Sequence, residues 1–132
     1  MLLKDFYTVV DHSGTETEIN ASGVSNTHYH FILKLNPDHP VYQGHFPGNP
    51  VVPGVCQIMM IQELVNQIQD KPMRLEHADT VKFLSLIVPG QNPLLNFDFS
   101  CKENEVNKIS TNVTIHAGDT IFLKFRGTFS QS

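Results

Sequence analysis

Alternation of apolar and polar residues dominates the chain and predicts β-strands in four segments. In each of them every second residue is apolar, as in a strand with one buried face. The apolar positions are Tyr29, Phe31, Leu33 and Leu35; Leu95, Phe97, Phe99 and Cys101; Ile109, Val113 and Ile115; and Ile121, Leu123, Phe125 and Phe129. Two further segments, 6–10 and 80–88, are predicted as strands with a less regular pattern.

One long helix is predicted over residues 55–69, a segment that contains neither Gly nor Pro. At about 100° per residue, its aliphatic and polar side chains separate onto opposite faces. The aliphatic face holds Ile58, Ile61, Leu64, Val65 and Ile68, and the polar face holds Gln62, Glu63, Asn66, Gln67 and Gln69. Further apolar residues surround the first turns, so we expect the N-terminal half to be buried on nearly all sides. One buried helix with several strands predicts an α+β fold.

Composition narrows the function classes. The chain has 132 residues, 40% of them hydrophobic and 17% charged, and we expect a single domain over residues 1–132. The formal net charge of −4 and the scattered basic residues argue against nucleic-acid binding. No apolar stretch reaches the roughly 20 residues that a membrane helix needs. Two cysteines make no disulfide framework and the N-terminus lacks a signal-peptide pattern, so a cytoplasmic location is expected.

The segment before the predicted helix carries candidate chemistry. Four prolines and three glycines between residues 40 and 54 predict a shaped loop that delivers Gly54 to the helix start. Free N–H groups at a helix N-terminus suit a developing oxyanion, and Gly54 adds no side chain in the way. His45 lies nine residues earlier and is a suitable base near neutral pH. Together they suit proton abstraction next to a carbonyl, although a lone loop histidine is more often a surface or hydrogen-bonding residue.

The sequence HFPGNPVVPGV, from His45 to Val55, resembles the active-site motif of the hot-dog fold 3-hydroxyacyl-[acyl-carrier-protein] dehydratases. VKF at 81–83 followed by IVPG at 87–90 resembles the strand and turn after the helix in that family. The resemblance extends from about residue 6 to residue 129. It implies a long central helix wrapped by a curved antiparallel sheet, and a dimer with each active site at the subunit interface.

The resemblance also implies residue roles. His45 would take the α-proton of a 3-hydroxyacyl thioester, and the Gly54 N–H would polarise its carbonyl. Phe46, Pro53, Val55 and Met59 would line the substrate pocket. The implied product is the trans-2-enoyl thioester, made in fatty-acid or polyene type synthesis without a metal or another cofactor.

The sequence departs from the family at the second catalytic group. The family carries a carboxylate on the helix fourteen residues after the histidine, contributed across the dimer. Here that position is Met59, which donates no proton. Glu63, four residues later on the same side, is the candidate replacement acid. Its place on the polar face favours a structural or interface role.

Two alternative functions stay open. The first is a hot-dog thioesterase, although no carboxylate is visible near the helix start. The second is a non-catalytic acyl-binding protein or a heterodimer subunit, whose partner would supply the carboxylate opposite His45. A homodimer is the default expectation. An acidic acyl-carrier protein would need a local basic patch, for which Lys82, Lys124 and Arg126 are the candidates.

Other side chains carry weaker predictions. Gln57, near the apolar face, is expected to be a hydrogen-bonded core amide. His28 and His30 share a strand face, but no carboxylate or cysteine completes the pair in sequence, so no metal site is predicted. Cys56 follows the helix start, where a thiol pKa is expected to fall, and core packing is its main expected role.

Overall fold

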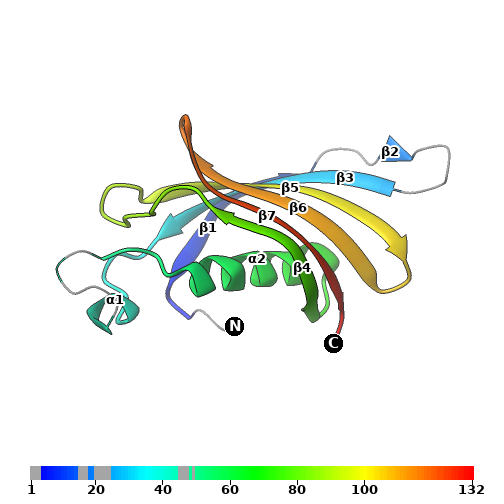
Figure 1. The fold of residues 1–132 in the computed structure, drawn as a ribbon, viewed down its shortest axis with the longest axis horizontal. Helices are drawn as coiled ribbons and strands as arrows, with labels where there is room; N and C mark the ends of the chain where they lie inside the picture. The colour runs from blue at the N-terminus through cyan, green and yellow to red at the C-terminus, as the bar shows by residue number, and fades with distance from the viewer. Residues whose placement is uncertain (1–3, 15–17, 20–24, 45–47, 49) are drawn as a thin grey trace.

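The structure is a computed structural model, and it describes residues 4–14, 18–19, 25–44, 48 and 50–132. A curved sheet wraps one long helix, α2 (Gly54–Gln69), which lies on its concave side (Figure 1). The strands are β1 (Tyr7–Gly14), β2 (Glu18–Ile19), β3 (Ser25–Leu35), β4 (Met73–Phe83), β5 (Leu94–Glu105), β6 (Lys108–Ala117) and β7 (Thr120–Gln131). A short helix, α1 (Val41–Gly44), precedes the loop that leads to α2. None of the helices in the described ranges is long and apolar enough to cross a membrane.

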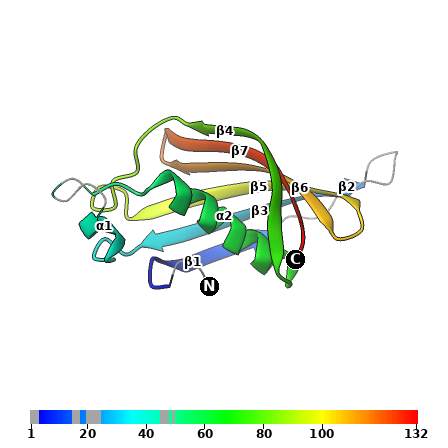
Figure 2. The same cartoon turned by 60° about the horizontal axis from the view of Figure 1, so that its bottom comes forward.

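The sheet is antiparallel throughout, in the order β1-β3-β5-β6-β7-β4, with β2 paired only to β3. Figure 2 shows α2 crossing the sheet with β1 on one side and β4 on the other. The chain passes along α2 to reach the far edge, so β1 and β4 are the two edge strands of the path. This is the helix-in-sheet arrangement that the hot-dog resemblance implies, and it confirms the predicted α+β class.

The core lies between α2 and the inner face of the sheet. The alternating apolar residues predicted for β3 and β5 face inward, and the rings of Phe31 and Phe99 meet edge to face at a centroid distance of 5.6 Å. On the helix, Met60, Ile61 and Leu64 are at most 1% exposed. Burial of these large side chains stabilises the fold by roughly 1.5–3 kcal/mol each.

Two predicted edge strands have different bounds from those expected. The strand predicted at 80–88 is β4, Met73–Phe83, and the one predicted at 6–10 is β1, Tyr7–Gly14. In β4 the pairing register shifts between Leu75 and His77 and again between Ala78 and Thr80, and in β1 it shifts between Val9 and Asp11. Each bulge interrupts the alternation that the sequence pattern depends on. The chain leaves the sheet after Phe83, so residues 84–88 are not strand.

The start of β7 corrects another prediction. Alternation places Ile121 inward and Phe122 outward, but Phe122 is 2% exposed and Ile121 37% exposed. The β6–β7 register shifts between Ile115 and His116, which inserts an extra residue at Phe122 and reverses the facing at this end.

The N-terminal half of α2 is also less buried than predicted. Val55 is 66% exposed, and Ile58 and Met59 are only partly buried against the core. Burial on all sides was expected from apolar character all round the helix. In one protomer, however, the sheet covers only one side of these turns, so an apolar surface remains open.

Candidate functional site

The loop that carries the motif ends at Gly54, the first residue of α2. Its N-cap residue is Pro53, and no side chain caps the helix. The Gly54 N–H lies in the first turn and has no acceptor within the helix itself, so this N-terminus has the donor and the positive dipole end that were predicted. His45 and Phe46 lie outside the described residues, so their roles stay predictions.

Glycine at position 54 allows a close contact with an aromatic ring. A Cβ added at Gly54 would lie 2.9 Å from Cζ of Phe83, the last residue of β4. The Phe83 side chain therefore packs against the start of α2 and forms an apolar wall beside the Gly54 N–H. The ring is itself 52% exposed, so this wall stands at the surface of the protomer.

Val52 and Gln57 fix the loop against the helix. The Val52 N–H donates to the Ile87 carbonyl at 2.9 Å, and the Val52 carbonyl accepts from Nε2 of Gln57 at 3.3 Å. Gln57 is 3% exposed, as a core amide should be, but its Oε1 has no hydrogen-bond partner in the described part of the chain. The prediction of a buried amide is confirmed, and the prediction that it is satisfied holds for the nitrogen only. Pro53, which is also buried, lies between Val52 and the start of α2.

The helix carboxylate is held by the first strand. Glu63 Oε1 accepts a hydrogen bond of 2.7 Å from the hydroxyl of Tyr7 in β1. Burial and then the neighbouring carboxylate raise the pKa of Tyr7 far above its usual value, so this hydroxyl stays a donor. Glu63 lies nine residues after Gly54, about 13 Å along the helix axis. Met59 lies between them, about 7.5 Å from Gly54 along the axis, partly buried against the core.

This geometry favours the structural role of Glu63 over that of a relocated acid. A carboxylate that accepts from Tyr7 is oriented toward β1 rather than toward the loop. Tyr7 could not be predicted as its partner, because the two residues are 56 positions apart in the chain.

A hollow of about 560 Å³ lies against the described part of the loop. Its lining includes Tyr42 of α1, which is 6% exposed and whose hydroxyl has no partner in the described ranges. Nearby Cys56 is buried, and burial raises the pKa of its thiol. The prediction of a lowered thiol pKa at the helix start is therefore wrong, because desolvation outweighs the helix dipole. The lining residues are Pro37, Asp38, His39, Tyr42, Gln43, Gly48 and Pro50.

On the outer face of the sheet, His30 and His116 both lie near the carboxylate of Asp98, a contact that was not predicted. His30 pairs in register with Asp98, and the closest ring-to-carboxylate contact of His30 is 3.8 Å. His116 Nε2 lies 2.5 Å from the other oxygen of Asp98. Across the described ranges, no three His, Cys, Asp or Glu side chains are arranged to hold a metal ion.

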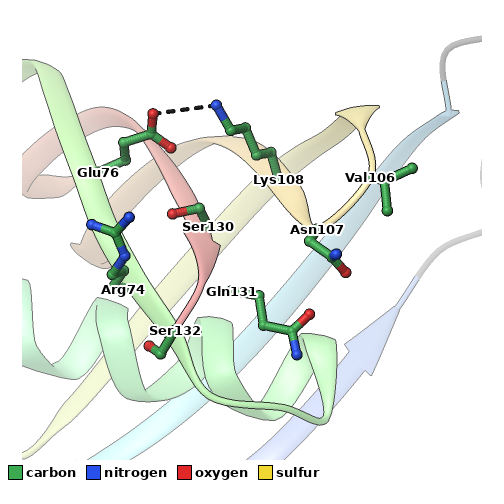
Figure 3. Close-up of a pocket in the computed structure, with 8 residues that line it drawn as sticks. All are labelled: Arg74, Glu76, Val106, Asn107, Lys108, Ser130, Gln131 and Ser132. Carbon is green, nitrogen blue, oxygen red and sulfur yellow. Dashed lines mark hydrogen bonds and ion pairs between the residues drawn. The ribbon is translucent and has the colours of Figure 1, made fainter.

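A second cavity, of about 430 Å³, lies at the other end of the molecule, by the start of β4 and the end of β7 (Figure 3). An ion pair between Glu76 and Lys108, with an O–N distance of 3.3 Å, crosses one side of it. The ion pair lowers the pKa of Glu76. This cavity is remote from Gly54, so we do not assign it to the loop chemistry.

The clearest surface feature beside Gly54 is apolar. We call it the apolar edge, and it consists of exposed residues on α2, on β4 and just after β4. They are Val55, Val81, Phe83, Leu84 and Leu86, with exposed fractions of 66%, 40%, 52%, 51% and 73%. Since β4 is an edge strand with unpaired backbone groups, this surface has the character of an interface.

Comparisons with known proteins support the family resemblance. The model of the ApeI-like family, described as ApeI dehydratase, matches residues 21–120. Two enzymes named 3-hydroxyacyl-[acyl-carrier-protein] dehydratase FabZ are similar in sequence. The one from Novosphingobium aromaticivorans is 26% identical over 121 residues, 85% of this chain and 77% of that enzyme. The one from Syntrophomonas wolfei is 29% identical over 84 residues, and the match spans only 58% of its length and 58% of this chain.

Solved structures share the fold. A chain of the dehydratase heterocomplex ApeI:P from Xenorhabdus doucetiae has a TM-score of 0.64 at 14% identity, covering 94% of this chain and 97% of that one. An uncharacterized protein from Erwinia carotovora subsp. atroseptica has a TM-score of 0.66 at 18% identity, covering 96% of this chain and 95% of that one. At these identities the likeness shows the fold alone.

Proposed function

Because the chain belongs to the ApeI-like dehydratase family, we propose that it removes water from a 3-hydroxyacyl thioester carried on acyl-carrier protein. The product is the trans-2-enoyl thioester. The relatives named as 3-hydroxyacyl-[acyl-carrier-protein] dehydratases support this substrate class. The observation that carries the proposal is the start of α2, where the motif loop delivers an uncapped helix N-terminus at Gly54.

The proposed chemistry uses the loop and the helix start together. His45 takes the proton from the carbon next to the thioester carbonyl. Negative charge then develops on the carbonyl oxygen, and the Gly54 N–H and the helix dipole stabilise it. The electron pair forms the new C=C bond as the C–O bond to the 3-hydroxyl breaks. That hydroxyl leaves as water once an acid gives it a proton, a contribution of typically 10²- to 10⁴-fold in rate.

We propose that a partner subunit supplies this acid. On α2, Met59 stands where the family carries this acid, and the carboxylate of Glu63 accepts a hydrogen bond from Tyr7. The apolar edge beside Gly54 leaves room for a partner to cover the site. One related structure is named a dehydratase heterocomplex, which supports a different chain as the partner. In a homodimer the site would lack the carboxylate and turn over slowly.

The test is turnover of a short 3-hydroxyacyl thioester by the purified chain, followed by two signals. Ultraviolet absorbance reports formation of the conjugated enoyl thioester, and a thiol reagent reports hydrolysis. We expect slow enoyl formation without thiol release, and we expect His45→Ala to abolish it while the melting temperature stays nearly unchanged.

Each other outcome identifies a different function. Thiol release that His45→Ala abolishes would replace the dehydratase with a thioesterase. Enoyl formation that survives His45→Ala would remove the histidine from the mechanism. No turnover by the chain alone or by its Met59→Glu variant would favour an acyl-binding protein.

A further inference from the structure

The cavity at the start of β4 and the end of β7 has a cation on each side of a buried hydroxyl (Figure 3). Arg74 of β4 and Lys108 of β6 are each paired in register with Ser130 of β7, and all three line the cavity. Side chains of directly paired residues lie on the same face of a sheet, so the three form one row across three strands. At about 5 Å per strand, the backbones of the two cations are about 10 Å apart. The hydroxyl therefore lies between two positive side chains.

Ser130, in the middle of the row, is a buried polar residue that faces the cavity. It is 7% exposed, and its Oγ makes no hydrogen bond of ordinary geometry with any residue that the structure describes. Figure 3 shows this hydroxyl pointing toward the side of the cavity where Arg74 lies. A buried polar group without a partner costs free energy, and nearly all such groups are hydrogen-bonded. This hydroxyl is therefore available to a ligand in the cavity.

Arg74 is the available cation of the row. Its exposed guanidinium forms no ion pair or hydrogen bond with another residue in the described ranges. Lys108, in contrast, is 3.3 Å from a carboxylate oxygen of Glu76. Glu76 is the extra residue where the register shifts between Leu75 and His77, and such a bulge redirects a side chain. Its carboxylate reaches across β7 to Lys108, so the positive charge of Arg74 is not used in this ion pair.

The charged side chains around the cavity favour an anion. Arg74, Lys108 and Glu76 line it and together carry one positive charge in excess, although the chain as a whole has a net charge of −4. Lys71 adds a further cation at the edge, where its Nζ donates a hydrogen bond of 3.2 Å to a lining amide. Lys108 above all, and then the nearby Ser130 hydroxyl and Arg74, lower the pKa of Glu76. Cations and donors thus converge on this cavity, as an oxyanion requires.

We propose that this cavity binds the oxyanion group of a small organic anion, which is a carboxylate or a phosphate monoester. The Arg74 guanidinium donates two N–H groups to two oxygens of the anion, and the Ser130 hydroxyl donates to one of them. The cavity volume of about 430 Å³ exceeds what such a group alone occupies and is ordinary for a small-molecule pocket. The rest of the ligand lies beside Val106 and the amides of Asn107 and Gln131.

This site is separate from the helix start that the proposed function uses. Helix α2 has 16 residues, a length of about 24 Å, and the cavity adjoins the strand that begins after its far end. The proposed anion is therefore a second ligand rather than the thioester, and the inference does not depend on dehydratase activity.

The direct test is isothermal titration calorimetry of the purified protein with phenyl phosphate and with benzoate, which share a ring and differ in the oxyanion. We expect saturable binding of at least one probe, and the tighter one identifies the oxyanion group. Arg74→Gln should weaken this binding about tenfold or more, because it removes the charge and the paired donors. The matched control is Arg126→Gln, an exposed arginine of β7 outside the cavity, which should leave the affinity within about twofold.

Two further variants should change the affinity in opposite directions. Glu76→Gln should tighten binding about threefold or more, because it removes a negative charge and releases Lys108. Ser130→Ala should weaken binding about threefold or more without lowering the melting temperature, because the hydroxyl contributes no hydrogen bond of ordinary geometry to the described fold.

Several results would overturn the site. One is no binding of either probe by the wild-type protein, and another is equal affinity of the wild-type protein and Arg74→Gln. Equal weakening by Arg74→Gln and Arg126→Gln would show a general effect of charge. A lower melting temperature for Ser130→Ala with unchanged affinity would show that the hydroxyl serves the fold and not a ligand.

Discussion

At the scale of single residues, Glu63 shows how a long-range contact decides between two roles. On the helix surface alone, Glu63 can either replace the acid missing at Met59 or belong to the polar face. The 2.7 Å hydrogen bond from Tyr7 ties it to β1. Removing a partner from a partly buried pair leaves an unsatisfied group, whereas an amide in place of the carboxylate still accepts the hydrogen bond.

We therefore predict that Glu63→Gln changes turnover of a short 3-hydroxyacyl thioester by no more than a few-fold. Glutamine keeps the shape and the acceptor for Tyr7, and the proton donor in this account lies on the partner subunit. Steady-state rates of the two proteins, measured under the same conditions, check this prediction. A fall of roughly 10² or more would show instead that Glu63 is the general acid.

At the scale of secondary structure elements, the close pairing of β7 with β4 depends on a glycine. Gly127 is paired with Ala78 of β4 and Thr111 of β6. A Cβ at this position would lie 2.9 Å from the His77 carbonyl oxygen and 2.8 Å from Cζ of Phe125. The carbonyl belongs to the backbone of the neighbouring strand, so relief of the clash requires the strands to shift.

We predict that Gly127→Ala lowers the free energy of unfolding by about 1–3 kcal/mol, as overpacking typically does. Gly90→Ala is the matched control, because no atom lies within 4 Å of a Cβ added there. Urea titrations of both variants give the comparison. Equal midpoints for Gly127→Ala and the wild-type protein would show that β4 and β7 are not packed as closely as the structure has them.

The elements also show what the sequence can and cannot predict. Strands β3 and β5 follow from alternation, because each pairs on both sides and has one buried face. The prediction placed β4 too far along the chain. Register shifts after Leu75 and after Ala78 break the alternation, and an edge strand buries few side chains. The predicted bounds of the helix were correct to within one residue, since fifteen residues without Gly or Pro form a strong periodic pattern.

The candidate site divides in the same way. The motif from His45 to Gly54 is contiguous, so its chemistry could be proposed from the sequence. Contacts between distant segments, such as Tyr7 with Glu63 or Phe83 with Gly54, depend on the three-dimensional path of the chain and have no local pattern. A single sequence also cannot show which surface a partner covers, and so the exposure of Val55 was missed.

At the scale of the whole molecule, the apolar edge predicts assembly. Its exposed aliphatic and aromatic side chains adjoin an edge strand and the start of α2. We predict that the wild-type protein is a dimer and that Leu86→Lys shifts it toward monomer, because a charge there must be desolvated on association. Val106→Lys is the control, since Val106 is 88% exposed but lies at the β5–β6 turn.

Analytical ultracentrifugation at several concentrations measures both variants. The expected result is a weaker dimer for Leu86→Lys and an unchanged one for Val106→Lys. Equal weakening of the dimer by both variants would mean a general effect of added charge rather than a specific interface. A dimer unaffected by Leu86→Lys would place the interface elsewhere.

We propose that this chain keeps a dehydratase site that lacks only its acid, and the decisive variant is Met59→Glu. Met59 is partly buried, so a carboxylate there will cost some stability and will have a raised pKa, which keeps it protonated and able to donate near neutral pH. The measurement is turnover of a short 3-hydroxyacyl thioester at several pH values, with thermal melts alongside. We predict a gain of at least about tenfold over the wild-type chain. A folded, dimeric Met59→Glu protein with no gain at any pH would show that this site lacks more than its acid.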